Sequence, residues 1–334
     1  MKTVVIFCAD LRFPGETFEK ESYWEAYSDL LLQLQAKGVR AYFATDNATY
    51  LGNGMFSEAF TMSERVRPEQ MTREEMVHAD LVYDRGAFAA DDIPVMNPKE
   101  MAQLGGDKTL MYYIFSKFQP FSATCNDREE LEHALDQIET DLVVVKDPTG
   151  FGGSGVHIGK RDEVLAKLEG ASYPLLAQEF MDTSVGIPGV VEGVHDLRIE
   201  MINGKAAACY VRSPKEGELR ANVALGGSAQ YLDPHEIPAR AIYLSKRIDA
   251  YFRGLPRHYA IDFARTTTGW KLIELNAYPG LTPISFGTAN AHIMNMLTNY
   301  IVKLTRGKRN WLRLPSLNLP KLGAEEPSGA ETAS

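Results

Sequence analysis

The residues with the clearest potential for chemistry in this sequence are Asp262, Glu274 and Asn276. If the stretches that carry them form a hairpin, Asp262 lies directly opposite Glu274, and Asn276 follows on the same face. Two facing carboxylates raise each other's pKa unless a positive group lies between them. Such oxygen ligands suit Mg²⁺, which takes one or two carboxylates and completes its coordination with water and phosphate oxygens. We therefore predict a Mg²⁺ site, with a solvated polar face of an edge hairpin as the alternative.

The predicted hairpin rests on two apolar runs separated by a turn. Tyr259–Ala264 and Trp270–Leu275 favour strands and flank a cluster of turn-type residues. A three-residue loop, Thr267–Gly269, with its glycine in the left-handed conformation, is the simplest connection. That loop pairs Thr266 with Trp270, and counting outward by twos then brings the two carboxylates face to face.

A glycine-rich stretch follows a short apolar strand and could cover phosphate groups. The strand Leu142–Val145 leads into Lys146, and four of the six residues in 150–155 are glycines, which lets backbone N–H groups approach phosphate closely. Val156–Gly159 reads as a strand, so the helix that a Rossmann motif requires is missing, and no Lys-Ser/Thr pair follows the glycines as in a P-loop. We predict a lid over ATP phosphates, with a plain hairpin loop as the alternative.

Four other cationic side chains stand where they could bind anions. Lys108 falls in the first turn of a helix predicted over Asp107–Lys117, whose first residue is a suitable N-cap. The helix dipole disfavours a cation there, which makes this lysine a candidate for an anionic ligand. Arg212, Lys215 and Arg220 lie in a polar segment and could gather around a multiply charged anion. Solvated side chains are the alternative in each case.

The first 95 residues predict a small α/β domain. Strands over Thr3–Cys8, Arg40–Thr45 and His78–Tyr83 alternate with a helix over Ser22–Lys37. Ligands of such sheets lie beyond the carboxyl ends of the strands. The charged residues at those positions, which are candidates for substrate contacts or else surface loop charges, are Asp10, Arg12 and Arg85.

The remaining stretches continue an α/β pattern. Leu175–Met181 reads as a sheet strand that could also be an adenine-binding hinge. Leu197–Ile202 and Lys205–Val211 flank Asn203-Gly204, which is a strong type I′ hairpin signal. We also predict a linker over Pro94–Pro98, helices over Asn97–Leu104, Pro238–Arg253 and Thr288–Leu304, the last packed on a sheet, and a mostly disordered tail over 306–334.

Composition limits the class of protein. The chain has 334 residues, 45% hydrophobic and 24% charged, with a net charge of −9, which is ordinary for a globular protein of two or three domains. The acidic balance argues against nucleic acid or an anionic membrane as the main partner. Three scattered cysteines without C-x-x-C spacing indicate neither zinc nor disulfides. We expect a cytoplasmic protein without a signal peptide or a membrane span.

The order of these stretches resembles that of the ATP-grasp superfamily of carboxylate–amine ligases. Lys108 precedes Lys146 and its glycine flap, and an acidic hairpin closes the series. The run Lys215–Gly227 is similar to the arginine loop of the glutathione-synthetase-like branch, which includes ribosomal-protein glutamate ligases. Glu274–Leu281 is similar to that branch's metal motif, although it lacks the Ser-Pro-Thr run of bacterial glutathione synthetase. The resemblance covers roughly residues 97–304.

The resemblance implies an α/β ATP-grasp fold with a Rossmann-like N-terminal domain. The implied boundaries are 1–95 for that domain and 96–305 for the ATP-grasp domain, with a lid over about 110–180 and a catalytic part over 181–305. It implies ATP and Mg²⁺, or Mn²⁺, as cofactors. The implied ATP contacts are Lys108, Lys146, Gly150, Gly152, Gly153, Ser154, Gly155, Gln178, Glu179, Met181, Asp182 and Arg198. The implied metal ligands are Asp262, Glu274 and Asn276, and the implied catalytic residues are Arg212, Arg220 and Asn222.

The activity implied is the ATP-dependent formation of an amide bond through an acyl phosphate. The resemblance suggests a small-molecule carboxylate and an amine, such as an amino acid or a short peptide, as substrates, and a homo-oligomer as the assembly. The alternatives are a small-molecule kinase, which needs the same parts without the amine, and a nucleotide-binding regulatory protein without turnover.

Overall fold

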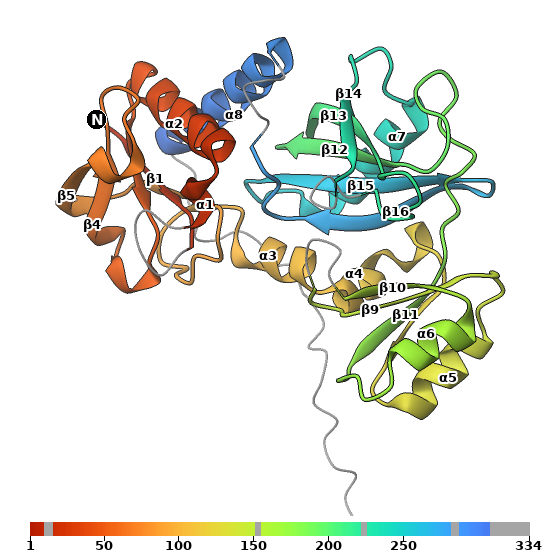
Figure 1. Ribbon diagram of the computed structural model, residues 1–334. Coiled ribbons are helices and arrows are strands. Elements are labelled where there is room, and N and C mark those ends of the chain that lie inside the picture. Colours follow the sequence, from red (N-terminus) through yellow and green to blue (C-terminus); the bar gives the residue numbers. More distant parts are fainter. Residues whose placement is uncertain (10–15, 151–154, 222–225, 282–286, 308–334) are drawn as a thin grey trace, which may run out of the picture.

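The computed structural model describes residues 1–9, 16–150, 155–221, 226–281 and 287–307. Within these ranges the strands form three sheets, of seven, four and five strands (Figure 1). The mixed α/β prediction is confirmed. The predictions that lie outside the described residues are those for Asp10, Arg12, Gly152, Gly153, Ser154 and Asn222, and that for most of the tail 306–334.

The first sheet combines a parallel centre with an antiparallel extension. The parallel strands run in the order β2-β1-β6-β7, and β3, β4 and β5 extend the sheet beyond β2. The strand predicted over His78–Tyr83 is confirmed for Leu81–Tyr83, but its start is wrong, because one strand ends at His78 and the next begins at Leu81. Between them, Asp80 accepts hydrogen bonds from Lys2 Nζ and Thr3 N. The elements of this domain are β1 (Thr3–Phe7), α1 (Glu16–Glu19), α2 (Glu21–Ala36), β2 (Arg40–Ala44), η1 (Asn47–Thr49), β3 (Tyr50–Gly52), β4 (Met55–Thr61), η2 (Pro68–Gln70), β5 (Thr72–His78), β6 (Leu81–Asp84) and β7 (Val95–Met96).

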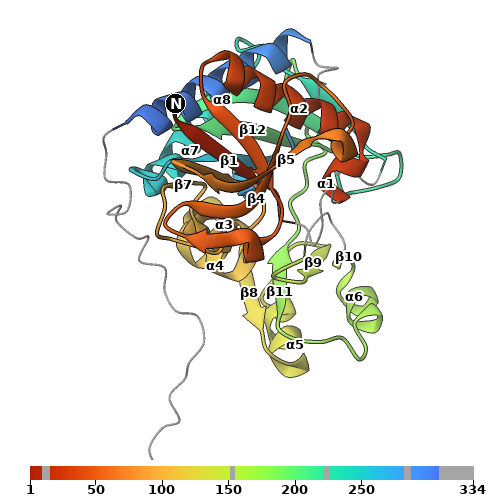
Figure 2. The same ribbon diagram turned by 90° about the vertical axis from the view of Figure 1, so that its left-hand side faces the viewer.

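The last helix of the described chain completes the core of this first domain. Helix α8 (Thr288–Arg306) lies beside α2 in both views (Figures 1 and 2). Leu297 and Ile301 of α8 share one buried cluster with Leu30 and Leu34 of α2. The same cluster contains Val4 and Ile6 of the first sheet, so the expected packing of this helix on a sheet is confirmed.

A four-stranded sheet, here called the lid sheet, has helices on one face. Its order is β10-β9-β11-β8, and every neighbouring pair is antiparallel. Val143 and Val145 point into a core shared with the helices, so Val144 and Lys146 point to the opposite face, because side chains alternate along a strand. Its elements are β8 (Ser122–Cys125), α5 (Arg128–Asp136), β9 (Val143–Lys146), β10 (Val156–Gly159), α6 (Arg161–Lys167) and β11 (Leu175–Glu179).

A five-stranded antiparallel sheet, here called the C-terminal sheet, faces the lid sheet. Its order is β14-β13-β12-β15-β16. Asn203 and Gly204 have φ angles of 47° and 81° between β12 and β13, as the predicted type I′ turn requires. Its elements are β12 (Asp196–Ile202), β13 (Lys205–Ser213), β14 (Ser228–Tyr231), α7 (Ala239–Asp249), η5 (Ala250–Phe252), β15 (His258–Thr266) and β16 (Gly269–Asn276).

The acidic hairpin reaches the predicted register by a different route. Thr266 pairs with Gly269 rather than with Trp270, so the connection is shorter than the predicted three-residue loop. A bulge leaves Ile273 as one extra residue, and Asp262 then pairs with Glu274 as predicted. The shorter turn shifts the pairing by one residue and the bulge shifts it back, so the two departures from the predicted geometry cancel.

Two short helices connect the first domain to the two facing sheets. They are α3 (Lys99–Gly106) and α4 (Lys108–Phe115), followed by η3 (Ser116–Phe118). Asp107 accepts hydrogen bonds from Thr109 N and Leu110 N, which confirms it as the N-cap of α4. The predicted linker over Pro94–Pro98 contains β7, so the first sheet ends at Met96. None of the helices described is long and apolar enough to cross a membrane.

Candidate active site

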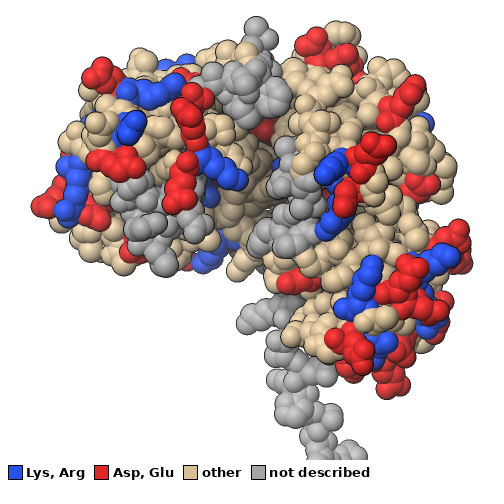
Figure 3. Space-filling view, viewed as in Figure 1, with Lys and Arg blue, Asp and Glu red and all other residues tan. Residues whose placement is uncertain are grey.

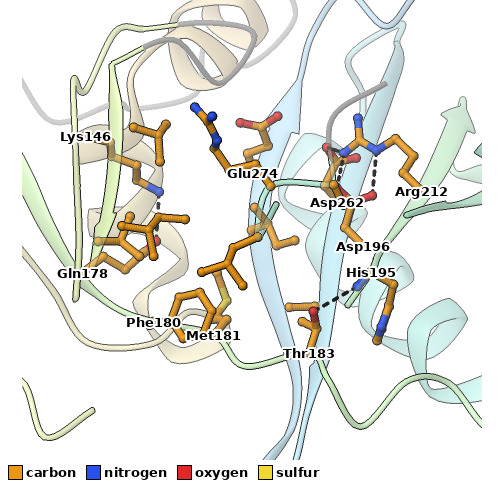
Figure 4. A pocket seen from close by; sticks show the side chains of 18 of the residues that line it. Lys146, Gln178, Phe180, Met181, Thr183, His195, Asp196, Arg212, Asp262 and Glu274 are labelled. Atoms are coloured by element: carbon orange, nitrogen blue, oxygen red, sulfur yellow. Dashed lines mark hydrogen bonds and ion pairs between the residues drawn. The ribbon is translucent and has the colours of Figure 1, made fainter. Parts of the chain in front are cut away.

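A cavity lies between the lid sheet and the C-terminal sheet, and both sheets line it (Figure 4). Lys146 and Gln178 approach it from the lid sheet, and Asp262 and Glu274 approach it from the opposite side. Its lining includes Val144, Lys146, Val156, Ile158, Phe180, Met181, Thr183, His195, Asp196, Arg212, Arg220, Asp262, Ile273 and Glu274. We call this the first cavity.

The two predicted lysines both line the first cavity. Lys146 donates a hydrogen bond to Gln178 Oε1 at 2.9 Å, and burial lowers its pKa to about 8. Lys108 Nζ donates to the Gly150 carbonyl, and burial lowers its pKa as well. Its backbone N–H donates to the Pro148 carbonyl at 2.9 Å. The start of α4 is thereby fastened to the segment that leads into the glycine-rich stretch.

One wall of the first cavity is apolar. Val144, Ile158 and Phe180 provide a surface of the kind that holds a planar ligand. No sequence motif singles out Phe180, although it lies in the run Leu175–Met181 that could form an adenine-binding hinge. Thr183 and His195 also line the cavity, and no motif indicates either of them. Strand alternation would have found Val144, since it lies two residues before Lys146.

The residues predicted near adenine and ribose divide into two groups. Met181 and Gln178 line the first cavity. The Glu179 carboxylate instead accepts a hydrogen bond from Phe121 N at 3.0 Å, and the Asp182 carboxylate accepts one from Ser184 N at 2.8 Å. The side chains of Glu179 and Asp182 therefore serve local backbone groups outside the cavity lining.

Two arginines surround Asp262. Arg198 donates from Nε and Nη2 to the two Asp262 oxygens at 2.6 and 2.5 Å, and Arg212 Nη2 adds a contact of 2.7 Å. Arg212 also makes a bidentate pair with Asp196, at 2.6 and 2.7 Å. Burial alone would raise the pKa of Asp262, but the two guanidinium groups hold it at about 2. The positive charge expected between the carboxylates is thus supplied, for Asp262, by arginine.

Sheet register explains this arrangement. Asp196 pairs with Arg212 across β12 and β13, and Arg198 pairs with Asp262 across β12 and β15. The next pair along the same face is Asp262 with Glu274, and Arg198 Nη2 lies 3.9 Å from Glu274 Oε1. Acidic and basic side chains of four strands therefore lie together on one face of this sheet, and the Asp262–Glu274 pair joins two like charges.

A second cavity adjoins the first. Lys108, Arg212 and Glu274 line both cavities. Asn276 lines the second cavity, and its Oδ1 accepts a hydrogen bond from Tyr278 N at 2.9 Å. The other residues of the second cavity are Tyr23, Ala102, Gly105, Gly106, Arg198, Leu275, Ala277, Tyr278 and Gly280. Of the three predicted metal ligands, Asp262 thus lines the first cavity, Asn276 the second and Glu274 both.

The other cationic residues predicted to bind anions lie in different surroundings. Arg220 lines the first cavity, and its Nη2 lies 3.3 Å from Glu218 Oε2. Lys215, by contrast, is part of neither lining. The interpretation of Arg85 as a substrate contact is not supported. Its guanidinium is buried, donates to Tyr27 Oη and the Pro279 carbonyl, and lines neither cavity.

The sequence and fold of this chain match known proteins. A family model described as the RimK-like ATP-grasp domain matches residues 117–301. The chain belongs to the RimK-like ATP-grasp family. This family match covers the lid sheet and the C-terminal sheet, which enclose the first cavity.

Relatives of this ATP-grasp protein carry glutamate ligase names. A probable alpha-L-glutamate ligase from Thioalkalivibrio sulfidiphilus is 28% identical over 200 residues, which are 58% of this chain and 61% of the relative. Another from Legionella pneumophila is 31% identical over 189 residues, which are 55% of this chain and 56% of the relative. The matched region thus spans only part of the length of these relatives.

Solved ATP-grasp structures share the fold over most of this chain. A RimK domain protein from Sphaerobacter thermophilus has a TM-score of 0.56 at 16% identity, over 90% of this chain and 99% of the other. The D-alanine–D-alanine ligase from Bacillus anthracis, solved with ATP, has a TM-score of 0.60 at 14% identity, over 91% and 97% of the two chains. These similarities establish the ATP-grasp fold.

Proposed function

We propose that this protein is an ATP-dependent carboxylate–amine ligase that forms an amide bond through an acyl phosphate and releases ADP and phosphate. The observation that carries the proposal is that Lys108, Arg212 and Glu274 line both cavities. A nucleotide in the first cavity and a carboxylate in the second would meet at this charged boundary. Phosphoryl transfer needs such an arrangement, because it depends mainly on positioning and on nearby positive charge.

The first cavity has the chemistry that ATP requires. Its apolar wall, formed by Val144, Ile158 and Phe180, suits a purine, and Lys108 and Lys146 provide cations for the phosphates. In the same proposal, Gly150–Gly155 covers the phosphates, Met181 borders the base and Asp182 lies near the ribose. A closed cover would also keep water from an acyl phosphate.

The boundary between the cavities has oxygen donors that suit Mg²⁺ or Mn²⁺. Glu274 lines both cavities and keeps 39% of its side chain exposed, and Asn276 lines the second cavity. Asp262 fits less simply, because its carboxylate already accepts three hydrogen bonds from Arg198 and Arg212. A metal there would require Asp262 to share an oxygen with an arginine. When bound, the metal would neutralise charge on the transferring phosphate.

The chain's own cations have distinct proposed roles in the reaction. Arg212 is fixed by Asp196 and Asp262, so its guanidinium can orient a carboxylate or phosphate at the boundary without moving. Arg220 lies in a loop on the cavity side, where it would contact the transferred phosphoryl group. Asn222 is proposed to act beside Arg220.

We propose an amino acid or a short peptide as the substrate class. The second cavity supports this because Tyr23 and Tyr278 give it apolar walls while Asn276 gives it a polar one. Acidic and basic side chains are mixed on the face shown in Figure 3, where no broad basic surface for a nucleic acid is seen among the described residues. A homo-oligomer is proposed by analogy with the family.

The first test is phosphate release from Mg-ATP in the presence of a matrix of amino acids and small carboxylates. Positive wells are then examined by mass spectrometry. Release that needs two co-substrates, with a product mass equal to their sum less water, would support the ligase. A stable phosphorylated product from one co-substrate would favour a kinase, and ATP binding without turnover would favour a regulatory protein.

A further inference from the structure

A chain of hydrogen bonds runs from the first cavity into the lid sheet. Lys146 Nζ donates to Gln178 Oε1 at 2.9 Å, and Gln178 Nε2 donates to Ser122 Oγ at 2.7 Å. Ser122 Oγ donates in turn to the Pro120 carbonyl at 3.3 Å. Gln178 is only 1% exposed, so both ends of its amide are occupied inside the protein.

The buried end of this hydrogen-bond series, at Pro120, fixes which group donates at each step. The Pro120 carbonyl can only accept, so the Ser122 hydroxyl directs its proton there and offers its lone pairs to Gln178. The amide must then turn its nitrogen toward Ser122 and its oxygen toward Lys146. The orientation of Gln178 therefore follows from the backbone at Pro120.

Strand pairing holds the three side chains on one face of the lid sheet. Ser122 pairs directly with Gln178 across β8 and β11, and Gln178 pairs with Val144 across β11 and β9. Lys146 lies two residues beyond Val144 and therefore on the same face. The relative positions of these groups are thus set by the sheet backbone.

The group that accepts the hydrogen bond of Lys146 is the neutral amide of Gln178, and this determines how much of the lysine's positive charge remains. Within the described ranges, no carboxylate lies within ion-pairing distance of Lys146; Glu274 acts from beyond that distance to raise its pKa, and Lys108 acts to lower it. Arg198 and Arg212, by contrast, share their charge with aspartates in direct contact. An amide oxygen can orient an ammonium group without cancelling its charge. A glutamate at position 178 would orient the same group but would neutralise it.

We propose that Gln178 is a positioning residue, oriented by Ser122, that presents the uncancelled charge of Lys146 to the phosphates of a nucleotide in the first cavity. The proposal rests on the nucleotide site of the proposed function. It gives Gln178 a role on the phosphate side of the nucleotide, in place of the predicted contact with adenine.

The test compares the affinities of ATP and adenosine for the full-length wild type and for variants, by isothermal titration calorimetry. Gln178→Met and Gln178→Glu should each weaken ATP binding by about tenfold, the equivalent of ~1.4 kcal/mol, while adenosine affinity stays within about twofold. Ser122→Ala should cause a smaller loss of the same selective kind. Gln178→Glu should also move the fall of ATP affinity at alkaline pH to a higher pH, because the added carboxylate raises the pKa of Lys146.

A matched control is Thr124→Ala. Thr124 lies on the same strand and face as Ser122, but its hydroxyl pairs with Thr109 at 3.0 Å, so ATP and adenosine affinities should not change. Thermal unfolding of each variant checks that it folds. Ser122→Ala removes a single oxygen atom and keeps the test open if the Gln178 variants do not fold.

The outcomes separate this inference from the proposed function. If the wild type binds no ATP, the proposed nucleotide site is wrong, and this inference fails with it. If the wild type binds ATP but the Gln178 variants lose ATP and adenosine affinity equally, Gln178 contacts the base and the inference is overturned. Unchanged ATP affinity in folded Gln178 variants would overturn it as well.

Discussion

The Tyr278 hydroxyl donates a hydrogen bond to Asp84 Oδ2 at 2.8 Å and thereby ties the end of β16 to the first domain. Arg85 and Asn97 donate to the backbone carbonyls on either side of Tyr278. The segment directly after Asn276 is therefore held by three side chains from the N-terminal part of the protein, two through its backbone carbonyls and one through the Tyr278 hydroxyl. These contacts couple the position of a predicted metal ligand to the docking of that domain.

Tyr278→Phe should destabilise the protein and weaken its response to Mg²⁺. The change leaves the buried Asp84 carboxylate without one donor, which costs about 1–3 kcal/mol in the free energy of unfolding. It should also raise the Mg²⁺ concentration needed for half-maximal ATP turnover, because the Tyr278 backbone positions Asn276. Urea denaturation and a Mg²⁺ titration measure the two effects.

Tyr300→Phe is the matched control for that prediction. The Tyr300 hydroxyl donates to Asn203 Oδ1 at 3.0 Å in an exposed setting, so its loss should change the unfolding free energy by no more than ~0.5 kcal/mol. Equal effects of the two substitutions would show that the Asp84 contact has no special role.

Glu274→Gln should raise the Mg²⁺ requirement steeply, by about tenfold or more, because an amide lacks the charge that a hard cation prefers. Glu274 lines both cavities, so the substitution tests the boundary itself. The measurement is ATP turnover against Mg²⁺ concentration. Glu132→Gln is a suitable control, since Glu132 is an exposed partner of Arg128 on α5. A normal Mg²⁺ titration in Glu274→Gln would remove Glu274 from the metal site.

Arg220→Ala should abolish ligation and spare most of the ATP affinity. Arg220 lies in the loop that follows β13 and lines the first cavity, and we assign it to the transferred phosphoryl group. A loss of transition-state contacts lowers kcat and kcat/KM together. Arg240→Ala controls for the loss of an arginine, because Arg240 lies over Tyr243 on α7. Turnover that matches the wild type would refute the assigned role.

ATP affinity should fall as the pH rises through about 8. Burial lowers the pKa of Lys146 to about 8, while Glu274 acts to raise it and Lys108 to lower it. Lys146 is therefore charged below this pH and increasingly neutral above it. Because phosphate favours the charged form, ATP binding near this pH should be accompanied by proton uptake.

Calorimetry in buffers of different ionisation enthalpy, from about pH 6.5 to 9.5, measures that uptake directly. Lys146→Met should bind ATP more weakly and should lose this part of the pH dependence. A variant whose affinity follows the same pH curve as the wild type would assign the titration to another group.

The local sequence is sufficient to predict those structural features that depend on residues close together in the chain. Tyr259–Ala264 and Trp270–Leu275 were predicted as strands because alternation and turn signals are properties of short segments. The pairing of Asp262 with Glu274 was predicted for the same reason. It survived a shorter turn because the bulge at Ile273 restored the register. The strand on each side of the glycine-rich stretch was likewise evident from its own residues.

Tertiary structure decided which distant groups meet. Arg198 and Asp262 are 64 positions apart, and their ion pair depends on the alignment of β12 with β15, which neither strand encodes alone. Arg85 follows a strand end, where ligand contacts are common, yet the packing of the first domain against the Pro279 backbone buries it. Periodicity shows which face of an element is apolar, whereas the partner of that face is chosen by the free energy of the whole packed chain.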